Sequence, residues 1–304
     1  MAPQLAWLGL GNMGRGMCKN LVEKGNLSHP LIIHNRTVKR AQELSAKIGH
    51  SVVASSIREL VSKADIIFYC LGDDPAVLST LDEILQSDVT GKVLVDCSTV
   101  HPDTTTKEAE LIENKGASFV ACPVFGAPAM ADSGNLICVL AGKVEAVDKV
   151  KPFCKGVMGR ENIDFSGQEP RKATLLKVLG NTFVVSMIET LSEGHVAAEK
   201  TGLGVKELHQ FIEIMFPGPY TAYSNRMQSG DYYQRDEPLF AVDLARKDAR
   251  HAMDLVSKAG GRMKNVELAD SYLKVVKEVQ GEKGDIAGIY GAKRVEAGLP
   301  FGNQ

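Results

Sequence analysis

A glycine-rich motif near the start of the chain constrains its fold most strongly. The motif reads Gly9-Leu10-Gly11-Asn12-Met13-Gly14 and follows a short apolar run; a helical pattern then extends to Lys24, and a second apolar run begins at Leu31. Between two strands, the first glycine allows a tight turn, the second lets the backbone approach a pyrophosphate, and the third permits close helix packing. We therefore predict a dinucleotide-binding βαβ unit, with the pyrophosphate at the N-terminus of the helix that starts near Asn12.

The end of the second apolar run predicts which nicotinamide cofactor binds. NAD-binding chains place an acidic residue here, about twenty positions after the glycines, to bind the ribose 2′-hydroxyl. This chain has Asn35, followed by Arg36 and Thr37. No carboxylate repels a 2′-phosphate, and the planar guanidinium of Arg36 is suited to bind one. We predict NADP (NADPH) rather than NAD; the alternative is that Arg36 is only a solvated residue at the start of a helix.

The rest of the chain divides into an alternating part and a helical part. Apolar runs over residues 65–71, 91–99, 118–124 and 136–141 alternate with helical patterns over 73–86 and 102–116. Continuous apolar runs are typical of a parallel sheet covered on both faces. We predict an α/β protein: a doubly wound, Rossmann-type NADP-binding domain over residues 1–167, followed by an all-helical substrate and dimerisation domain over residues 168–304.

One proline-free stretch, residues 171–200, is expected to form a long helix that joins the two domains. It is apolar on most sides, so it should be buried. Lys177, Asn181 and Glu189 interrupt the apolar run and argue against a membrane span. Lys177 and Asn181 are four residues apart and share one face, where buried polar groups need partners or a function. We expect both at a cleft facing the carboxyl ends of the strands.

Composition excludes several other functions. The net charge of −2 does not attract nucleic acid or anionic membranes. The N-terminal residues lack the basic region of a secretory signal, so we expect a cytoplasmic protein. The six cysteines form no C-x-x-C pair and the seven histidines no metal-binding spacing, so we predict reduced thiols and no metal site.

Five blocks of the sequence together resemble the β-hydroxyacid dehydrogenase family. They are the glycine motif, Asp96-Cys97-Ser98-Thr99, residues 123–128 (PVFGAP), Lys177 with Asn181, and Lys247-Asp248. The family includes 3-hydroxyisobutyrate dehydrogenases and the reductases of tartronate semialdehyde, succinic semialdehyde and glyoxylate. The resemblance covers essentially the whole chain, in order and at the family's spacing.

The resemblance implies a role for each matched residue. Lys177 matches the catalytic lysine, Asn181 the substrate-orienting asparagine, and Lys247 the lysine that closes over cofactor and substrate. The implied cofactor-binding residues are Gly9, Gly11, Asn12, Met13, Gly14, Asn35, Arg36, Thr37, Leu71, Thr99 and Lys247. The implied substrate-binding residues are Ser98, Phe125, Gly126, Ala127 and Asn181. The partner would be a small carbonyl or carboxylate compound, and the family is usually homodimeric or homotetrameric.

The chemistry of hydride transfer independently points to Lys177. Reduction of a carbonyl builds negative charge on its oxygen, which requires a proton donor within hydrogen-bond reach. Burial is expected to lower the pKa of a lysine and so suit it to proton exchange near neutral pH. The alternative is a lysine at a helix edge whose amine reaches solvent. Two rival functions, an imine reductase on the same fold and a non-catalytic NADP-binding scaffold, usually lack this lysine.

The chain departs from the family at Phe125-Gly126-Ala127, where most members carry Ser-Gly-Gly to bind the substrate carboxylate. Phe125 has no hydroxyl, so the carboxylate would be held by backbone N–H groups of Gly126 and Ala127 or by Ser98. The substitution also favours a larger or more apolar substrate. Residues 215–223 are expected to form a loop that either helps fill the pocket or packs on the surface.

Overall fold

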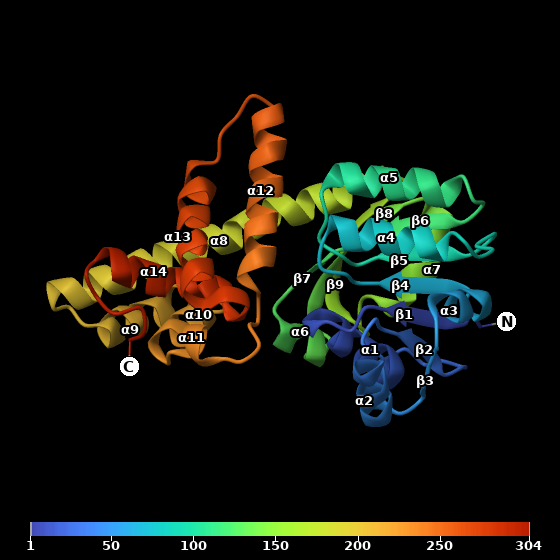
Figure 1. Cartoon of the computed structure of the whole chain (residues 1–304), viewed down its shortest axis with the longest axis horizontal. Coiled ribbons are helices and arrows are strands. Elements are labelled where there is room, and N and C mark those ends of the chain that lie inside the picture. Colours follow the sequence, from blue (N-terminus) through green and yellow to red (C-terminus); the bar gives the residue numbers. More distant parts are fainter. Residues whose placement is uncertain (1, 304) are drawn as a thin grey trace. The chain divides into compact units, whose positions relative to one another are not determined.

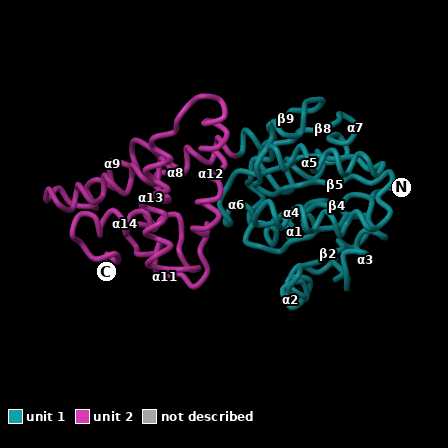
Figure 2. The backbone as a smooth tube through the Cα atoms, turned by 45° about the horizontal axis from the view of Figure 1, so that its top comes forward, with its two compact units in different colours: residues 1–177 teal, residues 178–304 magenta. Residues whose placement is uncertain are grey.

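The computed structural model describes residues 2–303, which form two compact units. The first extends to Lys177 and the second begins at Val178, as the two colours in Figure 2 show. The division falls inside helix α8 (Arg171–Thr201), the longest helix. The predicted helix over residues 171–200 is therefore confirmed, and the predicted domain boundary at residue 167 stays a prediction.

The first unit is built on a nine-stranded sheet with the strand order β3-β2-β1-β4-β5-β6-β8-β7, and with β9 beside β8. The strands are β1 (Leu5–Leu8), β2 (Leu31–His34), β3 (Ser51–Val53), β4 (Ile66–Tyr69), β5 (Val93–Asp96), β6 (Ser118–Ala121), β7 (Val124–Phe125), β8 (Leu136–Gly142) and β9 (Gly159–Ser166). All neighbours from β3 to β6 are parallel. This arrangement confirms the predicted Rossmann-type sheet.

The far edge of the sheet departs from the expected parallel arrangement. Strand β8 runs antiparallel to both β6 and β7, while β9 is parallel to β8. A parallel connection needs a crossover of a dozen or more residues. Only the short helix α6 (Pro128–Ser133) separates β7 from β8, so the chain can only turn back. Strand β9 was not predicted because its polar sequence, GRENIDFS, is mostly half-buried or exposed.

Helices cover both faces of the sheet, as expected for a doubly wound domain (Figure 1). They are α1 (Asn12–Lys24), α2 (Val38–Ile48), α3 (Ile57–Lys63), α4 (Asp74–Ile84), α5 (Pro102–Glu113), α7 (Val144–Val150) and the 3-10 turn η1 (Lys151–Phe153). Residues of α1, α2 and α7 share one hydrophobic core with alternate strand positions such as Trp7 and Phe68. Residues of α3, α4 and α5 share the other, with Ala6 and Ile67.

The second unit is helical. After α8 come α9 (Val205–Met215), α10 (Pro219–Gln228), α11 (Asp231–Gln234), α12 (Val242–Lys258), α13 (Lys264–Gln280), two 3-10 turns, η2 (Gly281–Lys283) and η3 (Ile286–Gly288), and α14 (Ile289–Glu296). The expectation of a loop over residues 215–223 is wrong in its second half. Pro219 occupies the first turn of α10, where a proline is well tolerated because that N–H has no partner within the helix.

Helix α8 is not buried on every side, contrary to expectation. Its Phe183 side chain is 80% exposed. By length and composition this is the one helix among residues 2–303 that could cross a membrane, and 56% of its most apolar window is buried inside the structure. Core helices of soluble proteins pass the same test.

Candidate active site

The glycine motif forms a turn in which three backbone segments come very close together. Gly9 has φ +96°, and a Cβ there would lie 2.4 Å from the carbonyl oxygen of Cys70. A Cβ on Gly14 would lie 2.1 Å from the carbonyl oxygen of Gly9. Gly11 has no atom within 4 Å of a built Cβ, so space is open beside it. Gly9 and Gly14 are therefore needed because a side chain would not fit, and Gly11 remains accessible to a ligand.

Helix α1 starts directly after this turn. Its N-cap is Gly11, and no side chain caps its first turn, so the helix dipole and backbone N–H groups at Asn12 to Gly14 favour an anion there. Asn35 anchors the turn, because its Oδ1 accepts a hydrogen bond from the Leu10 N–H at 3.0 Å. Its Nδ2 donates to the carbonyl oxygen of Thr37 at 3.1 Å.

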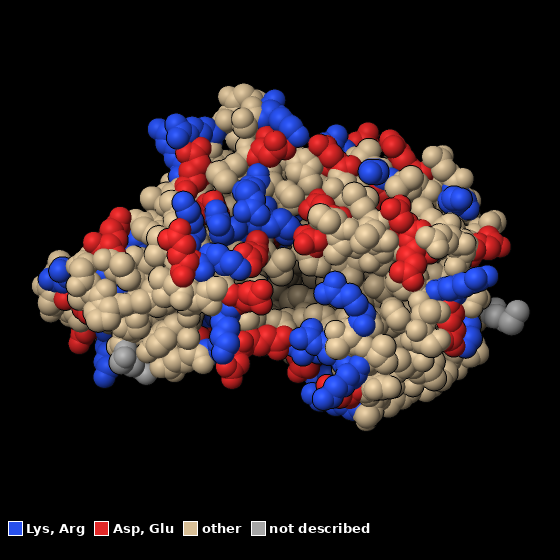
Figure 3. Space-filling model, viewed as in Figure 1, with Lys and Arg blue, Asp and Glu red and all other residues tan. Residues whose placement is uncertain are grey.

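The end of β2 carries positive charge beside Asn35. Arg36 and Thr37 are exposed, and α2 contributes Lys39, Arg40 and Lys47. Figure 3 shows a group of Lys and Arg side chains around this helix. Cations at the end of the second strand suit a phosphate on the cofactor ribose.

The loops after β4 and β5 are tied to each other next to the glycine turn. The Ser98 Oγ accepts a hydrogen bond from the Leu71 N–H at 2.9 Å, and the Ser98 N–H donates to Asp96 Oδ1 at 2.8 Å. The Leu71 side chain would lie 3.0 Å from a Cβ on Gly9, and Thr99 is half-buried. The carboxyl ends of three neighbouring strands thus bring together most of the predicted cofactor-binding residues of the first unit.

Lys177 lies in the first turns of α8, which belong to the sheet-containing unit. Thr174 holds this part of the helix against α5, because its Oγ1 accepts a hydrogen bond from Thr105 Oγ1 at 3.0 Å. The Lys177 side chain is 8% exposed, and its Nζ lies 4.6 Å from the centre of the Phe125 ring. A cation over an aromatic face is attracted to it. The structure therefore places Phe125, the departure from the family pattern, against the predicted catalytic lysine.

Phe125 is held by the antiparallel pairing of β7 with β8, where it lies opposite Ile137. The exposed Gly126 and Ala127 follow it directly. Gly126 has φ +142°, and a Cβ there would lie 2.6 Å from a methyl group of Leu136. The turn that presents these two residues thus requires glycine.

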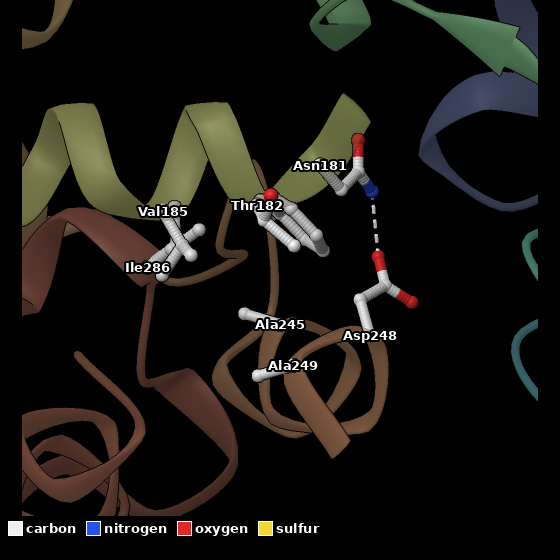
Figure 4. A pocket seen from close by; sticks show the side chains of 8 residues that line it. Asn181, Thr182, Val185, Ala245, Asp248, Ala249 and Ile286 are labelled. Atoms are coloured by element: carbon white, nitrogen blue, oxygen red, sulfur yellow. Dashed lines mark hydrogen bonds between the residues drawn. The ribbon is translucent and has the colours of Figure 1, made fainter. Parts of the chain in front are cut away.

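In the helical unit, Asp248 joins two predicted site residues. Its Oδ2 accepts a hydrogen bond from Asn181 Nδ2 at 2.7 Å, drawn in Figure 4, and its Oδ1 lies 3.1 Å from Lys247 Nζ. All three side chains are buried. A small pocket adjoins them, lined by Asn181, Thr182, Val185, Phe240, Ala245, Asp248, Ala249 and Ile286. No role was predicted for Asp248 from the sequence, although a carboxylate directly after Lys247 in a helical pattern could have indicated one.

Three buried thiols form a cluster that the sequence spacing did not reveal. The Sγ atoms of Cys122, Cys138 and Cys154 all lie within 4.8 Å of one another. Such a set can hold a thiophilic ion. Hydrogen bonding to Cys122 raises the pKa of the Cys154 thiol, whereas hydrogen bonds from Cys138, Cys154 and Cys97 lower the pKa of the Cys122 thiol. The absence of a metal site stays a prediction.

Comparison with known proteins identifies the family. Residues 4–166 match the family model described as the NAD binding domain of 6-phosphogluconate dehydrogenase. Residues 172–292 match the model described as NAD-binding of NADP-dependent 3-hydroxyisobutyrate dehydrogenase. The chain belongs to the β-hydroxyacid dehydrogenase family. This membership confirms the resemblance and establishes an NAD(P)-dependent oxidoreductase of that family.

Two of its relatives match this chain over most of their length. The NADH-dependent oxidoreductase ucdB of Aspergillus ustus is 38% identical over 290 residues, which cover 95% of this chain and 98% of the relative. Glyoxylate/succinic semialdehyde reductase 1 of Arabidopsis thaliana is 30% identical over 258 residues, 83% of this chain and 85% of the relative.

Solved structures of this family and its neighbours share the fold. The 3-hydroxyisobutyrate dehydrogenase of Mycobacterium tuberculosis, determined with L-serine, aligns with a TM-score of 0.78 at 23% identity, covering 97% of this chain and all of that one. An imine reductase of Streptomyces aurantiacus aligns with a TM-score of 0.63 at 18% identity, covering 94% of this chain and 98% of that one. At these identities the likeness shows the fold alone.

Replacing Asp248 should destabilise the helical unit. In Asp248→Leu, the buried Lys247 ammonium and the Asn181 amide lose a shared acceptor, which should lower the free energy of unfolding by about 3 kcal/mol. Urea denaturation followed by circular dichroism measures this change. Asp243→Leu on the same helix is the matched control and should cost less than about 1 kcal/mol, because Asp243 is 57% exposed where it pairs with Lys277. Equal effects of the two variants would contradict a structural role for the Asp248 contacts.

Proposed function

We propose that this protein transfers hydride between NADP(H) and a small β-hydroxyacid, semialdehyde or keto acid, with Lys177 as the general acid and base. The observation that carries the proposal is the burial of Lys177 at the start of α8, with its amine facing Phe125. Reduction of a carbonyl needs a proton donor within hydrogen-bond reach of its oxygen, and a lysine amine can supply that proton. Proton exchange with the substrate oxygen is a role that this residue type can fill in a family of NAD(P)-dependent oxidoreductases.

The proton and the hydride move in opposite senses in the two directions of the reaction. In reduction, hydride goes from the nicotinamide to the carbonyl carbon while Lys177 donates a proton to the oxygen. In oxidation, Lys177 accepts the hydroxyl proton as hydride leaves the carbon. Asn181, one turn further along α8, is proposed to orient the substrate, and its hydrogen bond to Asp248 fixes the rotamer of its amide.

Lys177 also separates this proposal from its two rivals. An imine reductase on the same fold and a non-catalytic NADP-binding scaffold would both be expected to lack the lysine. Lys177 is therefore the feature of this chain that favours a carbonyl substrate over an imine. Transfer to a carbonyl is the better-supported activity.

NADP is proposed as the cofactor because the cationic end of β2 suits a 2′-phosphate. Arg36 is exposed at the position where an acidic residue would bind the ribose of NAD. Asn35 is occupied by its two backbone partners, which leaves Arg36 as the main determinant. The Aspergillus relative is named as an NADH-dependent oxidoreductase, and titration of both cofactors distinguishes the two assignments.

The substrate is proposed to carry its carboxylate at the turn after β7. The Ser98 Oγ already accepts the Leu71 N–H, and its hydroxyl proton can still be donated. Backbone N–H groups of Gly126 and Ala127 are the other proposed donors. Phe125 makes this end of the site more apolar than a serine would, which favours a bulkier substrate.

We further propose domains over residues 1–167 and 168–304, a homodimer or homotetramer, and a cytoplasmic location.

Lys177→Ala should remove turnover while leaving cofactor binding intact. Loss of a general acid typically costs about 10²–10⁴-fold in rate. The measurement is the steady-state oxidation of NADPH with a panel of small aldehydes and keto acids, alongside a direct titration of NADPH. Lys172→Ala, an exposed position one turn earlier on the same helix, should behave like the wild type. Retained activity in Lys177→Ala would remove the proposed acid.

Arg36→Ala should weaken NADPH binding far more than NADH binding. A charge-assisted bond to a phosphate contributes about 2 kcal/mol, so the Kd for NADPH should rise about thirty-fold while that for NADH changes little. Lys47→Ala, near the other end of α2, should leave both affinities unchanged. Equal losses for the two cofactors would sink the assignment of NADP.

Phe125→Ser should shift the substrate profile toward short hydroxyacids. The variant restores the family hydroxyl at the carboxylate position and removes the ring beside Lys177, so kcat/KM for small acids should rise about tenfold, as expected for one added hydrogen bond to a charged group. Comparison of short and branched substrates in both directions measures the shift. An unchanged profile would place Phe125 outside the acid pocket.

A further inference from the structure

A buried glutamate lies beneath the loops that follow β4 and β5 and takes no part in the proposed hydride transfer. Glu108 lies on α5 and is fully buried. Its Oε1 accepts a hydrogen bond from the Tyr69 hydroxyl at 2.7 Å. Its Oε2 has no N–H or O–H donor in the described part of the chain. A buried carboxylate with only one neutral donor is strongly destabilised, which favours the protonated, neutral form of Glu108.

The second partner of Glu108 is another carboxyl group. Tyr69 and Asp96 are paired in register at the carboxyl ends of β4 and β5, so their side chains point to the same face of the sheet. The Asp96 carboxyl lies close enough to Glu108 to raise the pKa of Glu108, both by its charge and through a shared hydrogen bond. Two buried carboxyl groups in hydrogen-bond contact cannot both be ionised and must share a proton.

The shared proton belongs on Glu108. Asp96 accepts a hydrogen bond from the Ser98 N–H, which favours its ionised form. Burial, followed by the charge of Asp96, raises the pKa of Glu108 well above its usual range. The Tyr69 hydroxyl opposes this shift, because its hydrogen bond lowers the pKa of Glu108, while the charge of Asp74 raises it further.

We propose that Glu108 is a positioning residue that works as a neutral carboxylic acid and, by donating its proton to Asp96, fixes the Ser98–Thr99 loop for cofactor binding. The inference rests on the proposed function, because that loop is assigned to the site there. The contacts close a ring between two strands. Tyr69 donates to Glu108, Glu108 to Asp96, and Asp96 receives the Ser98 N–H. Ser98 in turn receives the N–H of Leu71, two residues after Tyr69.

The first experiment tests whether Glu108 is protonated, by comparing the stability of the wild type with that of Glu108→Gln between about pH 5 and pH 8. A folded-state pKa above the unfolded value of about 4.3 means that unfolding releases a proton, so the wild type loses stability as pH rises. Glutamine releases none. The unfolding constant of the wild type should therefore rise with pH relative to that of Glu108→Gln, by up to about tenfold per pH unit. Parallel pH profiles would overturn the neutral glutamic acid.

The second experiment tests positioning through the cofactor. Trp7 is the single tryptophan, and its Nε1 donates to the carbonyl oxygen of Gly9 at 2.8 Å, so energy transfer from Trp7 to NADPH or NADH reports binding. Glu108→Gln, which retains a donor for Asp96 and an acceptor for Tyr69, should keep the Kd within about twofold. Glu108→Leu should raise it about tenfold, the loss of one buried hydrogen bond to a charged group. Glu110→Gln, an exposed glutamate on the same helix, is the control.

Glu108→Asp provides a second break of the network in case the leucine variant does not fold. The aspartate keeps the carboxylic acid but moves it one methylene further from Asp96, so this variant should also raise the Kd for the cofactor. An unchanged Kd in either folded variant would overturn the positioning role. Failure of the wild type to bind either nicotinamide cofactor would instead contradict the proposed function, so the two failures are distinguishable.

Discussion

The close approach of backbone segments at the first turn of the sheet is the constraint on which the site depends. Gly9 passes so near the carbonyl of Cys70, and Gly14 so near that of Gly9, that neither position has room for a Cβ. This packing draws the ends of β1 and β4 and the start of α1 into one place. The buried Trp7 indole donates a hydrogen bond to the carbonyl oxygen of Gly9 and so stabilises the turn. The N-terminal end of α1, where free backbone N–H groups favour an anion, is therefore fixed by backbone geometry rather than by a charged side chain.

Buried polar contacts extend this order to the neighbouring strands. The register of β4 and β5 places Tyr69 directly opposite Asp96. In the loops that follow these strands, the Leu71 N–H donates a hydrogen bond to the Ser98 Oγ. The start of α8 packs on the α5 side of the same sheet, with Ala173 in its hydrophobic core. One unit thus contains both the cofactor loops and Lys177. Asn181 and Lys247 belong to the helical unit, where Asp248 connects them.

The features that the sequence predicted are those set by local chemistry. Helix α1 begins at Asn12 and stops at Gly25 as the pattern indicated, and α8 follows its proline-free run. Strand β9 was missed because an edge strand needs no apolar alternation, and the start of α10 was missed because residues 215–223 were expected to form a loop. The contact of Lys177 with Phe125 and the hydrogen bond between Asn181 and Asp248 join residues far apart in sequence. No local pattern predicts such pairings, although the carboxylate directly after Lys247 marked Asp248 as a candidate.

We propose that this protein delivers hydride to a carbonyl carbon next to the buried Lys177. To test this, the protein is incubated with NADPH deuterated at C4 and a panel of small aldehydes and keto acids, and the alcohols are analysed by mass spectrometry. Deuterium from one face of the nicotinamide should appear on the carbinol carbon of at least one product. Cofactor binding without label transfer to any carbonyl in the panel would contradict hydride transfer and support a non-catalytic binding module.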